Sequence, residues 1–191
     1  VWMTEANDRK SVVRTTKALS SFFRIALSKG EEWISLKDEE EHIRNYLVIQ
    51  KMRHRDLLDY SIHFDPELRE FRVLKLMLQP IVENAVEHGI KNRRGGGRVV
   101  VEGRLTEAGT ILLTVSDDGP GMSPERMVEV QKELGEKVVN IGRDHGFGLM
   151  NVNQRIQLYY GADWGVEVSS SEGRGTTVSI RLPAEQRENL H

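Results

Sequence analysis

Hydrophobic residues in the first part of the chain recur at helical spacing. Across residues 4–27 they occupy one stripe at steps of three and four residues, as in an amphipathic helix. The stripe consists of Val12, Thr16, Leu19, Phe23 and Leu27, flanked by Phe22 and Ala26. Gly30 is suited to end this helix, because glycine readily adopts the left-handed conformation common just after helix ends.

A second helix is predicted to begin with the acidic residues 38–41, whose charge is favourable near the positive end of a helix dipole. It would turn Ile43, Tyr46 and Leu47 inward. Two helices in so short a segment offer too little surface to bury both stripes. A helical bundle completed by a second copy is therefore favoured over a self-contained hairpin.

The periodicity changes after residue 55, where Tyr60, Ile62 and Phe64 alternate with polar residues as in a half-buried strand. The elements that follow are a helix at 73–90, strands at 99–105 and 110–117, a helix, a long loop at 131–144, a helix at 147–160 and two final strands. In the last strand every second residue is apolar, which predicts a sheet with one covered and one solvated face.

The expected fold class is α+β, a two-layer α/β sandwich whose mixed, largely antiparallel sheet is covered by helices on one face. We expect residues 1–55 to form a partial helical dimerisation region that precedes this sandwich. Residues 56–191 are expected to form the sandwich itself, as a second domain.

The composition narrows the function classes. A formal charge of -2, from 27 basic and 29 acidic residues among 191, gives no basic footprint for nucleic acid or an anionic membrane surface. Without cysteine, neither a disulfide framework nor a thiolate metal site can form, as is usual in a reducing compartment. No apolar run approaches the roughly 20 residues that a membrane-spanning helix needs. Because the chain opens on Val1, we expect it to be part of a longer protein.

Four clusters in the second part of the chain carry candidate chemistry. On a helix, Asn84 and His88 lie one turn apart, so an amide oxygen and an imidazole share a face that can hold Mg²⁺ and touch phosphate. Asp117 ends an apolar strand and can accept a hydrogen bond from an exocyclic amine. Gly119 and Gly121 follow it, and glycine lets the backbone approach a flat ring closely.

The third cluster places Gly146 and Gly148 at a helix start, where free backbone amides and the helix dipole attract phosphate. The fourth places Thr176 and Thr177 just before the last strand. Each cluster alone has a plain structural alternative, namely a surface helix, an Asp-Gly turn, a lone Gly-x-Gly or a hairpin turn. Their occurrence together in this order is more informative than any one of them.

The order of an Asn-bearing helix, Asp-x-Gly-x-Gly, a loop, Gly-x-Gly and Gly-Thr-Thr resembles the nucleotide-binding fold of gyrase, the heat-shock chaperone, histidine kinases and the mismatch-repair protein MutL. That resemblance covers residues 59–183. The string LQPIVENAVEHG at 78–89 is similar to that of the LytS and YesM group of sensor histidine kinases. ALSSFFR at 18–24 and RNYLVIQK at 44–51 resemble the same group, so the similarity spans nearly the whole chain.

The resemblance implies ATP and Mg²⁺ as ligands. Asn84 would ligate Mg²⁺, Asp117 would bind the adenine amino group, and His88 would lie near ribose or phosphate. The other implied contacts are Gly119 and Gly121 along the base, Gly146 and Gly148 at the phosphates, Thr177 near the adenine with Thr176 as its companion, and Lys137 and Arg143 as lid candidates for the γ-phosphate. Residues 56–191 would then be the ATP-binding catalytic domain.

One position departs from the hydrolysing members of this superfamily. In those members a glutamate four residues before the magnesium-binding asparagine activates water, and here that position is Pro80. Proline has no basic side chain, so phosphoryl transfer to another acceptor is favoured over hydrolysis. Glu83 is the nearest carboxylate, but it points in another direction on the helix and receives only a minor role.

The phosphorylated histidine of the resembling group lies in a His-Phe-Leu-Phe/Tyr-Asn motif, and no such string occurs in this chain. Of the six histidines, His88 and His145 belong to the candidate clusters. The remaining four are poor substitutes, since they lie among acidic residues, among arginines, on a strand and at the terminus: His42, His54, His63 and His191. We therefore expect no residue of this chain to be the phosphoacceptor. The chain alone is expected not to autophosphorylate.

The resemblance implies the ATP-binding catalytic region of a two-component sensor histidine kinase, acting on a histidine outside this chain and then on a response regulator. It also implies a homodimer formed through the amino-terminal helices, and a cytoplasmic portion of a membrane-anchored protein. Two alternatives stay open. One is an ATP-hydrolysing conformational clamp, against which Pro80 and the bundle-like start argue, and the other is a non-catalytic nucleotide-binding dimerisation module.

Overall fold

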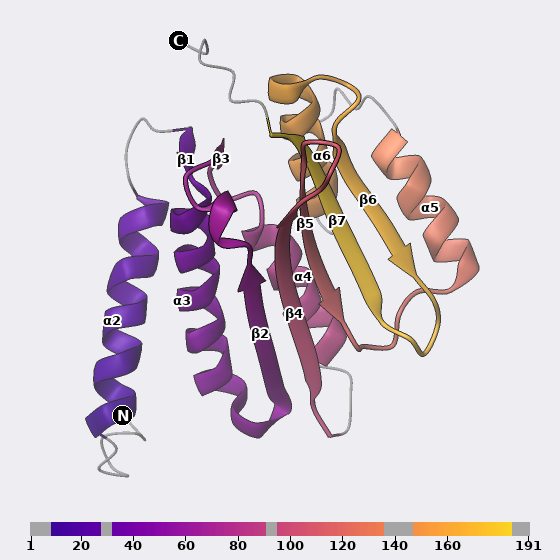
Figure 1. Cartoon of the computed structure of the whole chain (residues 1–191). Helices are drawn as coiled ribbons and strands as arrows, with labels where there is room; N and C mark the ends of the chain where they lie inside the picture. Colours follow the sequence, from indigo (N-terminus) through magenta and orange to yellow (C-terminus); the bar gives the residue numbers. More distant parts are fainter. Residues whose placement is uncertain (1–8, 28–31, 91–94, 136–146, 185–191) are drawn as a thin grey trace.

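Figure 1 shows the computed structural model, which describes residues 9–27, 32–90, 95–135 and 147–184. Its elements are α2 (Arg9–Ala26), β1 (Trp33–Ser35), α3 (Leu36–His54), β2 (Leu58–Phe64), β3 (Arg72–Leu74), α4 (Gln79–Ile90), β4 (Gly97–Leu105), β5 (Thr110–Asp117), α5 (Pro124–Gly135), α6 (Phe147–Tyr160), β6 (Gly165–Ser170) and β7 (Thr176–Pro183). None of the described helices is long and apolar enough to cross a membrane.

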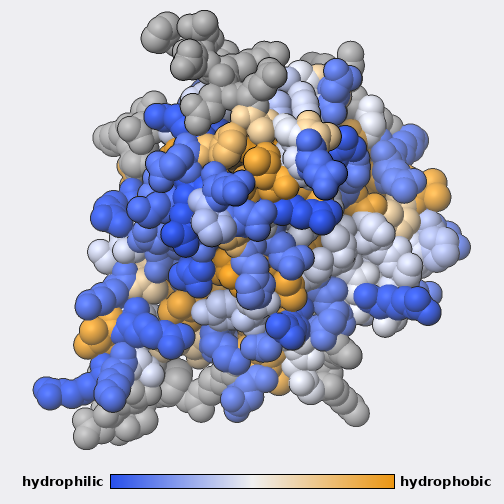
Figure 2. Space-filling model, viewed as in Figure 1, coloured by the Kyte–Doolittle hydropathy of each residue, from blue (hydrophilic) through white to orange (hydrophobic). Residues whose placement is uncertain are grey.

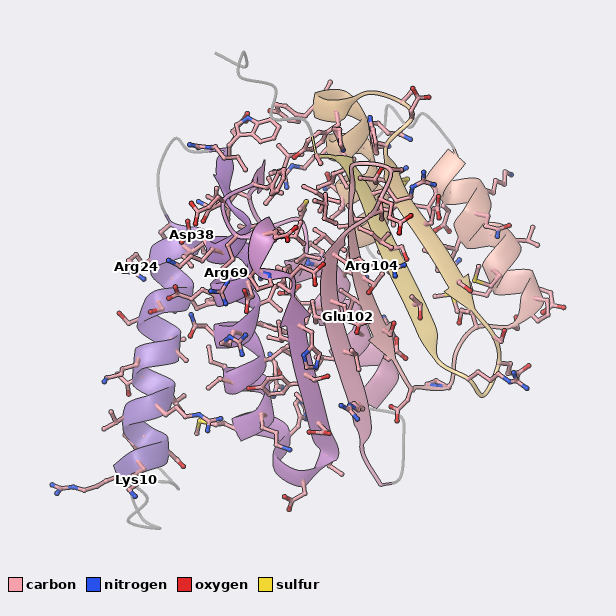
Figure 3. All side chains as sticks on the ribbon, in the orientation of Figure 1. Lys10, Arg24, Asp38, Arg69, Glu102 and Arg104 are labelled. Atoms are coloured by element: carbon pink, nitrogen blue, oxygen red, sulfur yellow. The ribbon has the colours of Figure 1, made fainter. Side chains whose placement is uncertain are left out.

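The main sheet has the strand order β2-β4-β5-β7-β6. β2 runs parallel to β4 and the other neighbours are antiparallel, so the sheet is mixed and largely antiparallel, as predicted. Side chains that alternate along the strands bury one face, among them Val99, Val101, Ile111, Leu113, Val115, Val178, Ile180 and Leu182. On the other face Glu102 and Arg104 of β4 are exposed (Figure 3), and hydrophilic residues predominate on that side of the molecule (Figure 2). The expected solvated face is therefore confirmed.

Helices cover the buried face of the sheet. In Figure 1, α4 and α6 lie behind the strands and α5 lies beside β6. Apolar residues of α4 and α6 pack against the sheet in one continuous core: Ile81, Val82, Ala85, Val86, Val152 and Ile156. This arrangement is the two-layer sandwich that the sequence predicts.

The two amino-terminal helices differ in their packing. Leu36, Ile43 and Leu47 of α3 belong to the same hydrophobic core as the sheet and α4, so packing continues across residue 55. Helix α2 packs on α3 and leaves part of its stripe open. Val13, Leu19, Phe23 and Leu27 are 43% to 71% exposed. The unburied apolar surface of the helical segment is therefore concentrated on α2 and the residue that follows it.

Two expected elements differ from the structure. The helix predicted at 73–90 begins only at Gln79, because Arg72–Leu74 forms β3 and pairs antiparallel with β1. A strand this short, with a partner far away in the sequence, leaves no periodicity of its own. The loop predicted at 131–144 is helical as far as Gly135, the last residue of α5, and the rest of it lies outside the described residues.

A buried carboxylate of α3 fixes the start of α4. Glu39 is fully buried and accepts hydrogen bonds from the backbone N–H groups of Leu76 (3.0 Å) and Leu78 (2.8 Å). Leu76 has a φ of 59°, a left-handed conformation that is strained for leucine. The carbonyl of Leu78 accepts the N–H groups of Ile81 and Val82 and closes the first turn. Glu39 therefore binds both the strained residue Leu76, just before α4, and Leu78, whose carbonyl closes the first turn of α4.

This carboxylate gives the fold a pH dependence of known sign. Burial raises the pKa of Glu39 from 4.5 to about 7, although the backbone N–H groups act in the opposite direction. A carboxyl whose pKa is higher in the folded state contributes stability at low pH that is lost as the pH rises through the folded value. Between pH 4.5 and about 7, the free energy of unfolding of the wild type minus that of Glu39→Gln should fall as the pH rises. The steepest fall is about 1.4 kcal/mol per pH unit.

Urea unfolding at several pH values across the window measures this difference. Glu41→Gln is the matched control, because Glu41 lies on the same helix and forms a partly exposed ion pair with Arg24. Its effect should stay nearly constant with pH. A difference for Glu39→Gln that grows as the pH rises would place the folded pKa below the unfolded one and contradict this account of the carboxylate.

Candidate functional site

A cavity of about 660 Å³ lies where β5 ends and β7 begins, bounded by α4, α5 and the first turn of α6. Its volume falls within the roughly 300 to 1,000 Å³ of small-molecule sites. Apolar side chains such as Val115 and Val178 line its floor. Asn84, Asp117 and Thr176 bring polar groups to its walls. The cavity thus joins elements that are far apart in sequence.

Asp117 is the carboxylate that β5 delivers to the cavity. Its Oδ1 accepts the N–H of Gly119 at 2.9 Å. Burial raises the pKa of Asp117, while the backbone N–H groups of Gly119 and Thr176 lower it. The neighbouring Asp118 is turned away and accepts the N–H of Arg98 at 2.7 Å. Of these two adjacent carboxylates, only Asp117 lines the cavity and can accept a hydrogen bond from a ligand there.

Gly121 and Gly175 let the adjoining turns approach one another. Gly121 has a φ of 67°, and a Cβ there would lie 2.0 Å from the carbonyl oxygen of Ser171. The turns are also joined by Ser170, whose hydroxyl donates to the carbonyl of Gly175 (2.8 Å) and accepts the N–H of Met122 (2.9 Å). Ser170 was not predicted from the sequence, since nothing distinguishes it within a run of three serines.

Helix α4 brings Asn84 and His88 to the cavity from one face, as their spacing predicts. The first turn of α6 packs closely beside them. A Cβ on Gly148 would lie 3.3 Å from the Cβ of Pro80 and 3.6 Å from Nδ2 of Asn84. The amino terminus of α6, whose first N–H groups have no partner within the helix, therefore stands next to the amide of Asn84, an arrangement that suits an anion and its cation.

The structure reverses the expected roles of the two threonines. Thr176 lines the cavity, whereas Thr177 is not among its lining residues. Successive strand residues point to opposite faces, so Thr177 lies on the other face of the sheet, where its hydroxyl pairs with that of Ser116 at 2.9 Å. Thr176 instead pairs with the hydroxyl of Ser170 at 2.9 Å. Strand register, which the sequence alone did not supply, decides between them.

The remaining predicted residues divide into three kinds. Gly121 and Gly148 line the cavity. Gly119 does not, and it contributes through its N–H to Asp117 instead. Gly146, Lys137 and Arg143 lie outside the described residues.

The residues present fit a nucleotide with a divalent cation. A half-buried carboxylate with an apolar floor suits an aminated ring, and it lies on a different wall from Asn84 and the start of α6. A neutral amide oxygen can ligate Mg²⁺ without adding negative charge beside phosphates. Fold and cavity therefore define a nucleotide-binding α/β sandwich.

Two family models match the chain. Residues 71–186 match the histidine kinase-, DNA gyrase B- and HSP90-like ATPase model, and residues 1–58 match the histidine kinase model. The chain belongs to the histidine kinase-, DNA gyrase B- and HSP90-like ATPase family. This result confirms the family that its motifs resemble.

Curated relatives are sensor proteins of bacteria. The chain is 25% identical to sensor histidine kinase YesM of Bacillus subtilis, over 95% of this chain and 29% of the relative. It is 31% identical to sensor histidine kinase BtsS of Escherichia coli, over 92% and 28%, and 34% identical to sensor protein LytS of Streptococcus mutans, over 86% and 27%. The chain thus spans under a third of the length of these relatives.

Solved structures share the fold. The histidine kinase domain of the Erythrobacter litoralis EL346 blue-light activated histidine kinase aligns with a TM-score of 0.56 at 17% identity, covering 95% of this chain and 83% of that one. A nucleotide-free catalytic domain of histidine kinase ThkA aligns with a TM-score of 0.56 at 20% identity, covering 81% and 99%. At these identities the likeness concerns the fold alone.

The turn between β6 and β7 offers a matched pair of glycines. Gly173 and Gly175 both have positive φ, 76° and 82°, so alanine at either position costs roughly 1 to 2 kcal/mol for the left-handed backbone. A Cβ on Gly175 would also lie 2.0 Å from the carbonyl oxygen of Asp117, whereas nothing lies within 4 Å of one on Gly173. We expect Gly175→Ala to cost a further ~1 to 3 kcal/mol and to weaken ATP binding. Urea unfolding and calorimetric titration test this, and equal losses in both variants would contradict the close approach to Asp117.

Proposed function

We propose that this chain is the ATP-binding catalytic region of a two-component sensor histidine kinase. It transfers the γ-phosphoryl group of Mg-ATP to a histidine outside this chain, from which the group passes to an aspartate of a response regulator. The observation that carries the proposal is the convergence of Asp117 and Asn84 on one cavity, with Pro80 in place of a water-activating glutamate.

At the adenine end, Asp117 accepts a hydrogen bond from the exocyclic amine. Its carboxylate is held by backbone N–H groups and lies above an apolar floor that suits a flat ring. Thr176 adds a hydroxyl beside it, and Gly121 leaves room along the base. Thr177 supports this end from the opposite face, through its hydrogen bond with Ser116.

At the phosphate end, Asn84 ligates Mg²⁺ and His88 contacts ribose or phosphate. The start of α6, with Gly148, offers backbone N–H groups to the phosphates. When bound, Mg²⁺ neutralises the charge that develops on the phosphate oxygens. Gly146 and the lid residues Lys137 and Arg143 complete the proposed set at the phosphates.

Transfer is favoured over hydrolysis because the position four residues before Asn84 carries no base. Pro80 packs against the first turn of α6, where a Cβ on Gly148 would lie 3.3 Å from its own. The nearby Glu83 is bound by the side chain of Gln79 at 2.7 Å and does not line the cavity. An acceptor brought by another segment then takes the phosphoryl group.

The proposed protein acts as a homodimer. The exposed apolar side chains of α2 supply a surface for a second copy, which would complete a helical bundle around the stripe. The chain spans less than a third of its curated relatives, and we propose that the longer protein is anchored in a membrane with this region in the cytoplasm. Its partner for the second transfer is a response regulator.

Replacing Asp117 tests the adenine contact. Asp117→Asn removes the charge and puts an amide donor where an acceptor is needed, so ATP affinity should fall by about 1 to 3 kcal/mol. Discrimination against GTP should fall with it. Asp118→Asn is the adjacent control, since its remaining oxygen can still accept the N–H of Arg98. Calorimetric titration giving equal ATP affinity for both folded variants would remove Asp117 from the site.

The transfer reaction has its own test. Residues 1–191 should bind ATP without labelling themselves. A chain extended upstream through the His-Phe-Leu-Phe/Tyr-Asn motif should instead acquire acid-labile phosphate from labelled Mg-ATP. Only the extended chain carries the imidazole that attacks the γ-phosphate. The label should disappear when the added histidine becomes glutamine. Stable labelling of residues 1–191 alone would contradict the external acceptor, and rapid ATP hydrolysis without labelled protein would favour a clamp.

A further inference from the structure

A chain of side-chain hydrogen bonds runs from α3 to the residue next to Asn84. Nε2 of His42 lies 2.7 Å from Oε1 of Gln79, and Nε2 of Gln79 donates to Oε1 of Glu83 at 2.7 Å. His42 is on α3, while Gln79 and Glu83 are on α4. From the sequence alone, His42 is expected to have no part in the chemistry and Glu83 only a minor one.

The direction of these hydrogen bonds fixes the state of the histidine. A carboxylate can only accept, so the amide NH₂ of Gln79 faces Glu83 and its carbonyl oxygen faces His42. Nε2 of His42 must therefore carry a proton and donate. Its Nδ1 is buried and has no hydrogen-bond partner among the described residues, which favours the neutral ring with Nδ1 unprotonated.

Burial lowers the pKa of His42 and keeps the imidazole neutral. The charge of Lys75 acts in the same direction, while Gln79 and the charge of Glu83 act against it. The ring is fully buried and stacks on Phe22 of α2, with centroids 4.4 Å apart and planes 16° apart. The position of His42 thus depends on how α2 packs on α3.

Glu83 lies between the helical segment and the cavity. It is next to Asn84, which lines the cavity, but Glu83 does not line it and is bound by Gln79, whose carbonyl oxygen faces His42 of α3. After burial, the charges of Glu83 and Glu87 contribute to the raised pKa of Tyr46 on α3, so both carboxylates lie near that helix. Because Glu87 also lines the cavity, the face of α4 that carries Glu83 borders the cavity rim.

We propose that Glu83 is the carboxylate that receives the ring N–H of the acceptor histidine, and that His42, acting through Gln79, is the positioning residue that holds it. The inference rests on the function proposed above. One ring nitrogen of the acceptor attacks the γ-phosphorus, and the N–P bond forms as the bond to the bridging oxygen breaks. ADP leaves with that electron pair, and the proton of the other ring nitrogen passes to Glu83.

The assignment explains two features together. Among the described residues, Gln79 binds one oxygen of Glu83, which leaves the second oxygen for an imidazole that arrives from the helical segment. A partly buried polar chain links two helices at a place where apolar side chains could also pack. Repacking of α2 on α3 would move His42 and so alter transfer without altering the adenine end.

The test uses the full-length protein and labelled Mg-ATP, and it measures both the rate of phosphohistidine formation at saturating ATP and the ATP dissociation constant. Glu83→Gln should lower the rate about 100-fold, the scale of a lost general base, and leave ATP affinity within about twofold. Glu41→Gln, a substitution of the same kind on the surface of α3, should match the wild type.

Two substitutions separate the hydrogen bond of His42 from its packing. His42→Phe keeps a ring on Phe22 but cannot donate, and we expect a loss of about tenfold or more in rate through misplacement of Glu83. His42→Gln keeps a donor and should stay within about threefold of the wild type. In a Glu83→Gln background, His42→Phe should have little further effect, because the two act as one unit.

Each outcome either supports or contradicts the roles proposed for Glu83 and His42. A wild-type protein that forms no phosphohistidine overturns the proposed function and this inference together. Labelled wild type with an undiminished rate in Glu83→Gln overturns the inference alone, as does a loss of ATP affinity parallel to the loss of rate. Equal losses in both His42 variants, or additive losses, remove the positioning role. If His42→Phe fails to fold, Gln79→Met breaks the chain at its middle, and an undiminished rate there contradicts the proposal.

Discussion

The buried carboxyl group of Glu39 is the constraint on which the rest of the molecule depends. A polar group in the interior costs stability unless its hydrogen bonds are made, and here the donors are the backbone N–H groups of Leu76 and Leu78. Those contacts join α3 to the segment before α4 and fix the residue at which α4 starts. With the start fixed, the helical period decides which residues face the cavity. The rotational position of Asn84 and His88 is therefore set by a residue of the preceding helix.

The two ends of the cavity are formed by different kinds of secondary structure. The end proposed for the phosphates is built from helices, whose positions depend on packing and on the contacts of Glu39 and His42. The end proposed for the adenine is built from the sheet, where the pairing of Asp117 with Thr176 and the hydroxyl of Ser170 hold two turns together. The first end can respond to movement of the helical segment while the second stays in place. In the kinase proposed above, this division would let the helical segment affect transfer more than binding of the base.

The sequence predicts regular elements where one periodicity runs without interruption. β5 at Thr110–Asp117 and α6 at Phe147–Tyr160 match the prediction residue for residue. The strand β3 was missed, because its pairing with β1 is a long-range interaction without a local signal. The motifs brought Asn84, His88, Asp117, Gly121 and Gly148 to one cavity as expected.

The sequence did not predict which way individual side chains point. Two adjacent threonines looked equivalent until the register of β7 assigned Thr176 to the cavity and Thr177 to the opposite face. The link from His42 through Gln79 to Glu83 could not be predicted either, since it needs the crossing of two helices. Composition and spacing identify which residue types are present, and packing decides which of them meet.

In the site we propose, the phosphates and the cation lie against Asn84 and the start of α6, with the base at Asp117. Mn²⁺ accepts the same oxygen ligands as Mg²⁺ and broadens the NMR signals of nearby amides. Titrating Mn-ATP into isotopically labelled protein therefore locates the cation directly. We predict the strongest broadening at the amides of Asn84 and Gly148, and much weaker broadening with clear shifts at Gly119 and Thr176. Broadening centred on Asp117, or on residues outside the cavity, would contradict this account of the site.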